Sequence, residues 1–567
     1  MPSLKKNLFF IILICGLLSG TCLSREFRRI PVEEYMDKMK AGWIGQMAGV
    51  GWGAPTEFRA LGFIIPERYL PEWRPEIINQ FYQDDLYVEM TFLRTLETRG
   101  LNASMREAGI DFARSGYPLW HANKAGRCNL RHGIAPPDSG HPKFNRHSDD
   151  IDYQIEADFS GLISPGMLNR AIKLGETFGR LMNYGDGVYG GQFIGAMYSE
   201  AFFEKDMVKI VEAGLNAIPQ GCQYHECISD VLKWYKENPE NWEKTWRLIE
   251  DKYNRNPEYR RSSCSLGAVF NIDAKINGAY VVMGVLYGKR DPDKTIMIST
   301  QCGQDSDCNP SSAAGILFTT IGYENLPDRF TSALNMDKKF SHTPYDFRKL
   351  CSVCETLARK TLLSEGGKIE KNEKGEEVFF IPFQSPAPGA LEQSWNPAPE
   401  QNSRFTETEM ADMASSASLQ SASDIDISKA VAEFAPGWKI IHCGNEMNPG
   451  LRQLKGSDKK ILATHPKSEL IPCVLSRNVD VPEGKKTILT LIVGRHLSGD
   501  WVLVVKVDGK MLVKNDMDEF TCRHGFTTIP VDLSPYAGKT IRLELEHRAD
   551  GWNFEGAFWF RIELRSE

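Results

Sequence analysis

The stretch Cys302-Gly303-Gln304-Asp305-Ser306-Asp307-Cys308-Asn309-Pro310 decides how this chain is organised, because it sets two carboxylates in front of a predicted helix. Asn309 is a typical N-cap, and Pro310 suits the first helical position, where its missing N–H needs no partner. Asp305 and Asp307 then precede a helix N-terminus, where the macrodipole favours their ionised form. On its own, such a turn is most simply a solvated acidic cap.

A second acidic pair, Asp84 and Asp85, changes this interpretation because it also lies at the start of a predicted helix. The helix carries apolar residues at helical spacing and ends at Gly100. We expect the fold to bring both pairs to one place. The inward-facing positions predicted for this helix are Leu86, Met90, Leu93 and Leu96.

An earlier helix is predicted from Pro31 to Met47, with a buried stripe at every fourth residue, and it leads into a glycine-rich segment. That segment, Gly49-Val50-Gly51-Trp52-Gly53-Ala54-Pro55-Thr56-Glu57, favours a backbone packed tightly against a neighbour. Pro55 is expected to end the helix. Glu57 then lies on a rigid turn. The stripe consists of Tyr35, Met39, Trp43 and Met47.

Length, charge and the first residues limit the classes of protein. A chain of 567 residues predicts two or three domains, and a net charge of -7 without a basic tract argues against nucleic acid as a partner. Residues 1–24 have the charged, apolar and small-residue regions of a signal peptide, so we expect an exported protein, periplasmic, secreted or at the cell surface. Lipidation at Cys22 is an alternative. No later transmembrane segment is predicted.

The middle of the helical part holds more polar residues that suit a binding site. Residues 116–146 lack periodicity and predict a long irregular loop, a kind of segment that is usually functional. No HxH or HExxH spacing is present, so a histidine zinc site is not indicated. A group of acidic residues at 148–158 follows, which can also be a solvated helix face, and then a glycine-rich turn at 183–191, which can also be an ordinary turn between helices. The residues expected to contact substrate are Trp120, His147, Asp149, Asp152, Glu156, Tyr184 and Tyr189.

The pattern changes to that of a β protein in the last third of the chain. A hairpin-like segment and a proline-rich run end near residue 395, a linker is expected at 396–436, and period-two alternation at 437–567 predicts a β-sandwich. Trp501, Val507 and the turn Asp508-Gly509 illustrate the alternation and its hairpin. The sandwich resembles carbohydrate-binding modules through Trp501, Trp552 and Trp559, although a place in the sandwich core is the simpler interpretation of each tryptophan.

The helical part resembles the ADP-ribosylglycohydrolase superfamily. The family motif Gly-Asp-x-x-Gly-x-x-x-Glu corresponds to Gly49–Glu57, its Thr-Asp-Asp-Thr to Gln83–Leu86, and its Gly-Asp-Thr-Asp-Thr-x-x-x-Ala to the segment from Gln304 to Ala313 and Ala314. The resemblance implies an all-α orthogonal bundle at residues 25–395 whose carboxylates hold two divalent ions, usually magnesium. It also implies that Glu57 acts on an anomeric carbon.

Several positions depart from the family motifs. Val50 replaces an aspartate, Gln83 and Leu86 replace threonines, and Cys308 stands where a hydroxyl ligand is expected. Magnesium prefers hard oxygen ligands, which a thiol and apolar side chains do not supply. The remaining aspartates are enough for one Mg²⁺ or Ca²⁺ ion. Residues that could replace the lost ligands are Asp149, Asp150, Asp152 and Asp186.

The sequence therefore predicts a multidomain, exported glycoside hydrolase that acts on a carbohydrate substrate. Glu57 is the expected acid/base, and Asp150 or Asp186 the second carboxylate that glycosidic cleavage requires. Two alternatives are a metal-dependent ADP-ribosyl hydrolase and a non-catalytic glycan-binding protein. The residues expected to hold the cation are Asp84, Asp85, Asp305 and Asp307.

Overall fold

The computed structural model describes residues 26–260, 269–416, 427–444, 447, 449–453, 460–467, 471–496, 499–518, 520–523, 525–549 and 554–567. The expected signal peptide and Trp552 lie outside these residues. The chain divides into two compact units. The first reaches Met410 without residues 114–118, and the second contains 114–118 and Ala411–Glu567. No helix among the described residues is both long and apolar enough to cross a membrane.

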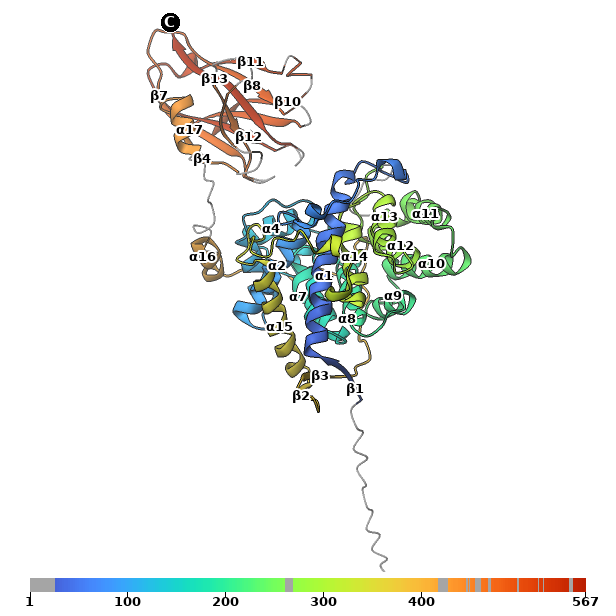
Figure 1. Cartoon of the computed structure of the whole chain (residues 1–567). Coiled ribbons are helices and arrows are strands. Elements are labelled where there is room, and N and C mark those ends of the chain that lie inside the picture. Colours follow the sequence, from blue (N-terminus) through green and yellow to red (C-terminus); the bar gives the residue numbers. More distant parts are fainter. Residues whose placement is uncertain are drawn as a thin grey trace, which may run out of the picture. The chain divides into compact units, whose positions relative to one another are not determined.

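Helices make up most of the first unit, as the sequence predicts (Figure 1). Helix α1 runs through the middle of this unit beside α14. The helices are α1 (Val32–Gly53), α2 (Asp84–Arg99), α3 (Met105–Ala113), α4 (His121–Arg131), α5 (Asp152–Ile155), α6 (Asp158–Leu162), α7 (Leu168–Phe178), α8 (Asp186–Ala201), α9 (Met207–Asn216), α10 (Gln223–Glu237), α11 (Trp242–Ile249), α12 (Ala274–Tyr287), α13 (Pro292–Gln301), α14 (Cys308–Ile321) and α15 (Phe347–Ser364).

Helix α1 confirms the predicted stripe, since Tyr35, Met39, Trp43 and Met47 are all fully buried. The helix nevertheless continues through the glycine-rich segment to Gly53. Glycine weakens a helix by roughly 1 kcal/mol relative to alanine, so tertiary packing must compensate for these residues. Helix α2 confirms its predicted start at Asp84, its four buried positions and its end before Gly100.

Two local predictions were wrong. Residues 116–146 contain helix α4, whose first N–H groups are satisfied by a side chain distant in sequence: Asp152 accepts hydrogen bonds from the N–H groups of Ala122 at 3.2 Å and Asn123 at 2.9 Å. The second wrong prediction concerns the helix after residues 303–307, which we call the acidic loop. This helix begins at Cys308, two residues earlier than predicted, and its N-cap is Asp307. Pro310 still lies in the first turn, where its missing N–H has no consequence.

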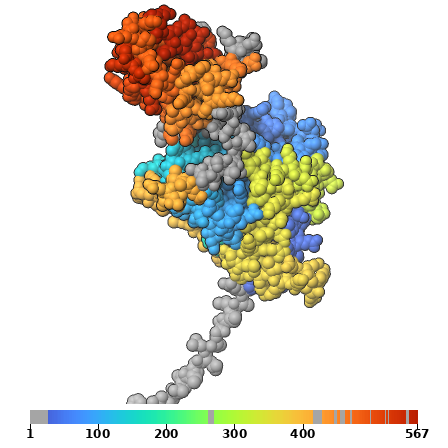
Figure 2. Space-filling model, turned by 90° about the vertical axis from the view of Figure 1, so that its left-hand side faces the viewer, coloured from blue at the N-terminus to red at the C-terminus, as the bar shows by residue number. Residues whose placement is uncertain are grey.

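A small sheet accompanies the helices, so the first unit is not purely helical. The predicted hairpin consists of β2 (Lys368–Lys371) and β3 (Glu377–Pro382), and β1 (Phe27–Pro31) pairs antiparallel with β3. The hairpin tip projects from the unit (Figures 1 and 2). Residues 384–406, which we call the strap, then run along the helical unit. For example, the N–H of Gln401 donates to Asp138 at 2.9 Å.

The expected linker is therefore partly structured. Its residues 396–406 belong to the strap, and α16 (Glu407–Ser416) follows. Residues 417–426 lie outside the described part, and α17 (Ile427–Phe434) packs on the sandwich core through Ala430 and Val431.

The second unit confirms the predicted sandwich, because two antiparallel five-stranded sheets enclose one core. Trp501 and Trp559 are completely buried in that core and cannot reach a ligand. The sheet orders are β10-β9-β12-β7-β4 and β11-β8-β13-β6-β5. The strands are β4 (Lys439–His442), β5 (Gly450–Gln453), β6 (Lys460–Thr464), β7 (Cys473–Asp480), β8 (Thr487–Arg495), β9 (Trp501–Val507), β10 (Lys510–Met517), β11 (Thr527–Asp532), β12 (Thr540–Arg548) and β13 (Ala557–Ser566).

Candidate functional site

Three glycines of α1 bring this helix into backbone contact with α14. A Cβ atom added to Gly45, Gly49 or Gly53 would lie only 2.5, 2.1 or 2.2 Å from the carbonyl oxygens of Ala314, Pro310 and Ser306, respectively. Glycines four residues apart share one helix face, so a continuous groove without side chains receives α14. The end of α1, which leads to Glu57, therefore lies directly against the acidic loop.

Hydrogen bonds join the turn after α1 to the same loop. The N–H of Phe58 donates to the carbonyl of Gln304 at 3.0 Å, and the hydroxyls of Thr56 and Ser306 lie 2.8 Å apart. Phe58 and Gln304 both have left-handed backbones, with φ values of 50° and 54°. Such conformations are costly for residues other than glycine and concentrate at functional sites. The two motifs thus form one fixed structural element.

The two aspartate pairs meet at Cys308. One ligand atom each from Asp84, Asp85 and Cys308 lie within 4.8 Å of one another, and the same holds for Asp305, Asp307 and Cys308. We call the four aspartates the acidic cluster. Helix α2 supplies one pair and the loop before α14 the other. Residues far apart along the chain are therefore assembled in one place, as expected from the sequence.

Burial and mutual repulsion dominate the electrostatics of the acidic cluster. Asp85, Asp305 and Asp307 are at most 4% exposed. Burial, followed by the charges of neighbouring carboxylates, raises the pKa of Asp85 and Asp305 well above its ordinary value. Burial also raises the pKa of Asp307, to about 6. Among the described residues, no lysine or arginine forms an ion pair with the cluster.

These carboxylates fit a divalent cation. One oxygen each of Asp85, Asp305 and Asp307 is buried without a hydrogen-bond partner. Buried carboxylate oxygens without a hydrogen-bond donor or a counter-charge are unfavourable unless a cation binds them, and oxygen ligands suit Mg²⁺ or Ca²⁺. Cys308 does not join such a ligand set: its thiol donates to Asp85 Oδ1 at 3.1 Å, and burial raises its pKa well above the ordinary value.

Glu57 differs from the acidic cluster because its side chain is exposed. Partial burial, and then the charges of Asp307 and Asp84, raise its pKa to about 8. A carboxyl group with this pKa holds a proton near neutral pH and still reaches solvent. Glu57 is thus the member of the site best placed to exchange a proton with a substrate.

A second set of buried acids lies behind the acidic cluster. Asp158 accepts from Tyr198 at 2.9 Å, and burial raises its pKa to about 8; Glu89 accepts from the N–H of Phe159 at 2.8 Å. Sequence analysis did not select Glu89 or Asp158. A signal was present for Glu89, because it follows Asp85 by one helical turn and shares its face.

Asp152 and Glu156 also lie near the acidic cluster but are held by α4. Asp152 caps this helix, and Glu156 accepts from the side-chain amide of Asn123. Burial raises the pKa of Asp152 to about 7. Burial and the charges of Asp152, Asp84 and Asp85 raise the pKa of Glu156. Both acids support the site's framework, and substrate contact by them stays a prediction.

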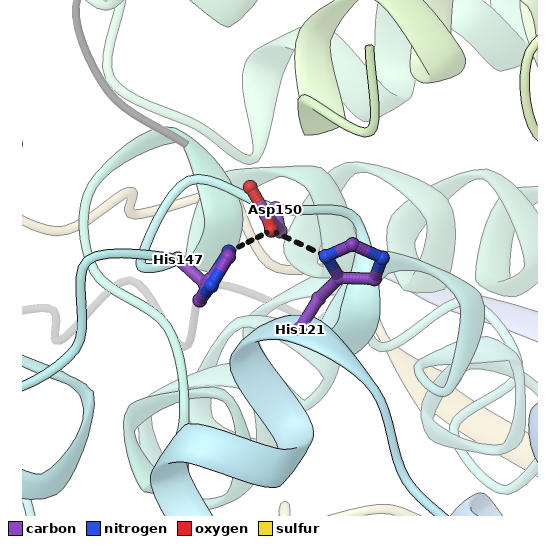
Figure 3. Close-up of side chains that lie close together, drawn as sticks. All are labelled: His121, His147 and Asp150. Carbon is purple, nitrogen blue, oxygen red and sulfur yellow. Dashed lines mark hydrogen bonds and ion pairs between the residues drawn. The ribbon is translucent and has the colours of Figure 1, made fainter. Parts of the chain in front are cut away.

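Asp150 and His147 lie on the turn before α5, together with His121 from the start of α4 (Figure 3). Asp150 is completely buried and lies between the two imidazoles, at 2.8 Å from His147 Nδ1 and 3.4 Å from His121 Nδ1. Trp120, next to His121, is 53% exposed. His121 was not among the predicted site residues, because a lone histidine within the predicted loop 116–146 carries no spacing signal.

The remaining predicted residues interact with the strap or with a buried lysine. Tyr184 accepts from the N–H of Ala398 at 3.1 Å, Tyr189 donates to the carbonyl of Ala390 at 2.8 Å, and Asp149 accepts from Ser394. These contacts hold the strap on the helical unit, so a role of Tyr184, Tyr189 and Asp149 in substrate binding stays a prediction.

Asp186 is buried near Lys275, a lysine that is only 2% exposed and that pairs with Asp273. Burial raises the pKa of Asp186 to about 6, although the charge of Lys275 opposes this shift. A buried ammonium group needs negative charge nearby, and the charges of Asp273 and Asp186 both stabilise that of Lys275, so Asp186 has a structural role. Its proposed service as a second catalytic carboxylate stays a prediction.

Comparisons with known proteins identify a family for the helical unit. A family model described as ADP-ribosylglycohydrolase matches residues 31–365. A solved structure described as an ADP-ribosylglycohydrolase-related protein complex is 14% identical and covers 58% of this chain and 99% of its own, with a TM-score of 0.35. A cyclase from Fischerella sp. TAU is also 14% identical and covers 24% of this chain and 86% of its own, with a TM-score of 0.20. No curated protein matches the chain.

Proposed function

Because this chain belongs to the ADP-ribosylglycohydrolase family, we propose that it is an exported hydrolase that cleaves a glycosidic bond in a glycan. One observation carries the proposal: an exposed Glu57 with a raised pKa lies beside a buried acidic cluster that fits a divalent cation. Export follows from the expected signal peptide, and it favours a glycan over ADP-ribosylated protein as the substrate.

Glu57 supplies the proton transfer in the proposed reaction. In its protonated form, the Glu57 carboxyl group donates a proton to the leaving glycosidic oxygen as the bond to the anomeric carbon breaks. The resulting carboxylate accepts a proton from the water that attacks the anomeric carbon.

The acidic cluster would hold the cation through Asp84, Asp85, Asp305 and Asp307. When bound, a divalent cation supplies Lewis-acid chemistry, which stabilises negative charge that develops on substrate oxygens. By holding the cation in place, the four aspartates would orient substrate hydroxyls relative to Glu57. The packing of α1 on α14 keeps Glu57 and the acidic cluster aligned with each other.

A panel of substrates tests the proposal. The full chain is incubated with aryl glycosides, oligosaccharides and an ADP-ribosylated protein, with Mg²⁺ and with chelator, beside Glu57→Gln. We expect cleavage of a glycoside or oligosaccharide that Glu57→Gln abolishes. If neither the wild type nor Glu57→Gln cleaved any glycan of the panel, the result would contradict glycoside hydrolysis.

Family membership favours one second candidate, a metal-dependent ADP-ribosyl hydrolase. It predicts release of ADP-ribose from the modified protein and loss of this activity with chelator. Cleavage of aryl glycosides that persists in chelator would exclude it. If no substrate were turned over and Glu57→Gln and Asp305→Asn changed no measured property, a non-catalytic glycan-binding protein would remain.

A further inference from the structure

Two imidazoles and one carboxylate form a compact group outside the acidic cluster. Nδ1 of His147 and Nδ1 of His121 lie 2.8 and 3.4 Å from the same oxygen of Asp150. One ligand atom from each of the three residues lies within 4.8 Å of the other two. Figure 3 shows both rings turned toward the carboxylate from opposite sides. The arrangement presents three possible metal ligands to one point.

The backbone and its neighbours hold this group firmly. His121 has a left-handed backbone with φ of 44°, a conformation that is costly for a residue other than glycine. Phe270 stacks on the His121 ring, with centroids 5.5 Å apart and planes at 22°. On the other side, the N–H of Asp150 donates to the carbonyl of His147 at 2.9 Å. The three side chains are thus fixed before any ligand binds.

Asp150 is not fully satisfied by the two histidines. Its Oδ2 interacts with both imidazoles, whereas Oδ1 is buried without a hydrogen-bond partner, although the residue is 0% exposed. Most buried polar atoms in folded proteins have a partner, so an orphan oxygen in a buried carboxylate calls for a ligand. Two imidazoles and one carboxylate are the ligand set of open sites for borderline transition metals.

We propose that His121, His147 and Asp150 bind one divalent transition-metal ion of the zinc class through the two Nδ1 atoms and the carboxylate. This site is separate from the acidic cluster, whose oxygen ligands prefer a hard cation. Nitrogen ligands discriminate against Mg²⁺ and Ca²⁺, so the two sites differ in the metals that they select. The proposal concerns metal binding alone and does not depend on the proposed hydrolysis.

Arg146 gives the proposal a specific consequence. Its guanidinium N–H donates to His147 Nε2 at 3.1 Å, so His147 carries its own proton on Nδ1 and donates it to Asp150. Ligation through Nδ1 moves that proton to Nε2, where it meets the guanidinium N–H. Arg146 is exposed and can turn into solvent, but its present contact and its charge both oppose the metal. Removing Arg146 therefore strengthens metal binding.

Calorimetric titration of the full chain with Zn²⁺, in excess Mg²⁺ to occupy the acidic cluster, tests the site. We expect one bound Zn²⁺ per chain, at least about tenfold weaker binding in His121→Ala and in His147→Ala, and severalfold tighter binding in Arg146→Gln. His442→Ala, which removes an exposed histidine of β4, is the matched control and should bind as the wild type does. Circular dichroism checks that each variant is folded.

Asp150→Asn keeps the shape of the side chain and removes the charge, so it covers the case in which a histidine variant fails to fold. It too should weaken Zn²⁺ binding, and a Co²⁺-loaded wild type should show visible absorption bands that Asp150→Asn and His147→Ala lose. Absence of a Zn²⁺ site in the wild type, or unchanged affinity in these variants, would overturn the proposal. Unchanged or weaker affinity in Arg146→Gln would overturn ligation through Nδ1.

Discussion

Replacing Gly53 with alanine perturbs the contact that aligns the two halves of the candidate site. The new Cβ atom would lie 2.2 Å from the carbonyl oxygen of Ser306 and 2.6 Å from Cα of Asp307, whereas ordinary contacts begin at 3.4 Å. Relieving the shorter distance requires a displacement of 3.4 − 2.2 = 1.2 Å. Both colliding atoms are backbone, so no side chain can rotate away, and Glu57 must shift relative to the acidic cluster.

The structure predicts opposing effects of unequal size for Gly53→Ala. Alanine favours the helix by about 1 kcal/mol, whereas overpacking in a tight interface costs typically 1–3 kcal/mol, so the variant should be destabilised by up to about 2 kcal/mol. A misplacement of about 1 Å in a catalytic site reduces turnover roughly 100-fold. We therefore expect activity to fall much further than stability.

Urea unfolding and kcat on the best substrate of the panel measure the two effects. The matched control is Gly389→Ala in the strap, where the added Cβ meets nothing closer than 3.6 Å, and we expect this variant to equal the wild type. Wild-type kcat together with wild-type stability in Gly53→Ala would refute the reasoning, because the backbone contact would then not position Glu57.

Three further predictions address the charges of the molecule. Glu57→Gln should lower kcat by about 10²- to 10⁴-fold and change KM little, as steady-state kinetics will show; near-normal turnover would rule out Glu57 as the acid. Asp305→Asn should stabilise the metal-free protein by about 1–3 kcal/mol at neutral pH, because it removes a buried carboxyl group that neighbouring carboxylates repel. Since a cation ligand is lost as well, the variant should not show the rise in Tm that Mg²⁺ causes in the wild type. Burial, and then His465, lower the pKa of His547 far below 6.5, so only the unfolded chain gains this proton as the pH falls below 6.5. Urea titrations should show the free energy of unfolding of the sandwich falling by about 1.4 kcal/mol per pH unit below 6.5. If this dependence on pH were unchanged in His547→Gln, the loss would belong to other groups.

Apolar spacing made much of the fold predictable. The stripe from Tyr35 to Met47 and the inward row of α2 follow helical periodicity, and the alternation from Trp501 to Val507 follows strand periodicity; all are buried as expected. The turn at Asp508-Gly509 could also be predicted from the local sequence, because its two residues favour a tight hairpin between β9 and β10. Patterns of this kind depend on the chain's own geometry and need no distant partner.

Features that depend on contacts between distant segments could not be predicted. Helix α4 starts where Asp152, 29 residues from Asn123 along the chain, accepts hydrogen bonds from its first turn. The start at Cys308 differs from the prediction for a local reason, because Asp307 rather than Asn309 is the N-cap. The meeting of Asp84 with Asp307 was expected from two acidic pairs at helix starts and from the family motifs, since local patterns do not show which distant segments meet. His121 could not be identified from the sequence, since its proximity to His147 arises from tertiary packing.

Binding of Mn²⁺ in place of Mg²⁺, measured by electron paramagnetic resonance on the full chain, tests the central claim that the two aspartate pairs form one site. We expect Asp85→Asn in α2 and Asp307→Asn before α14 each to abolish the same binding event, whereas His442→Ala should leave it intact. Binding that survives either aspartate substitution unchanged would contradict the claim.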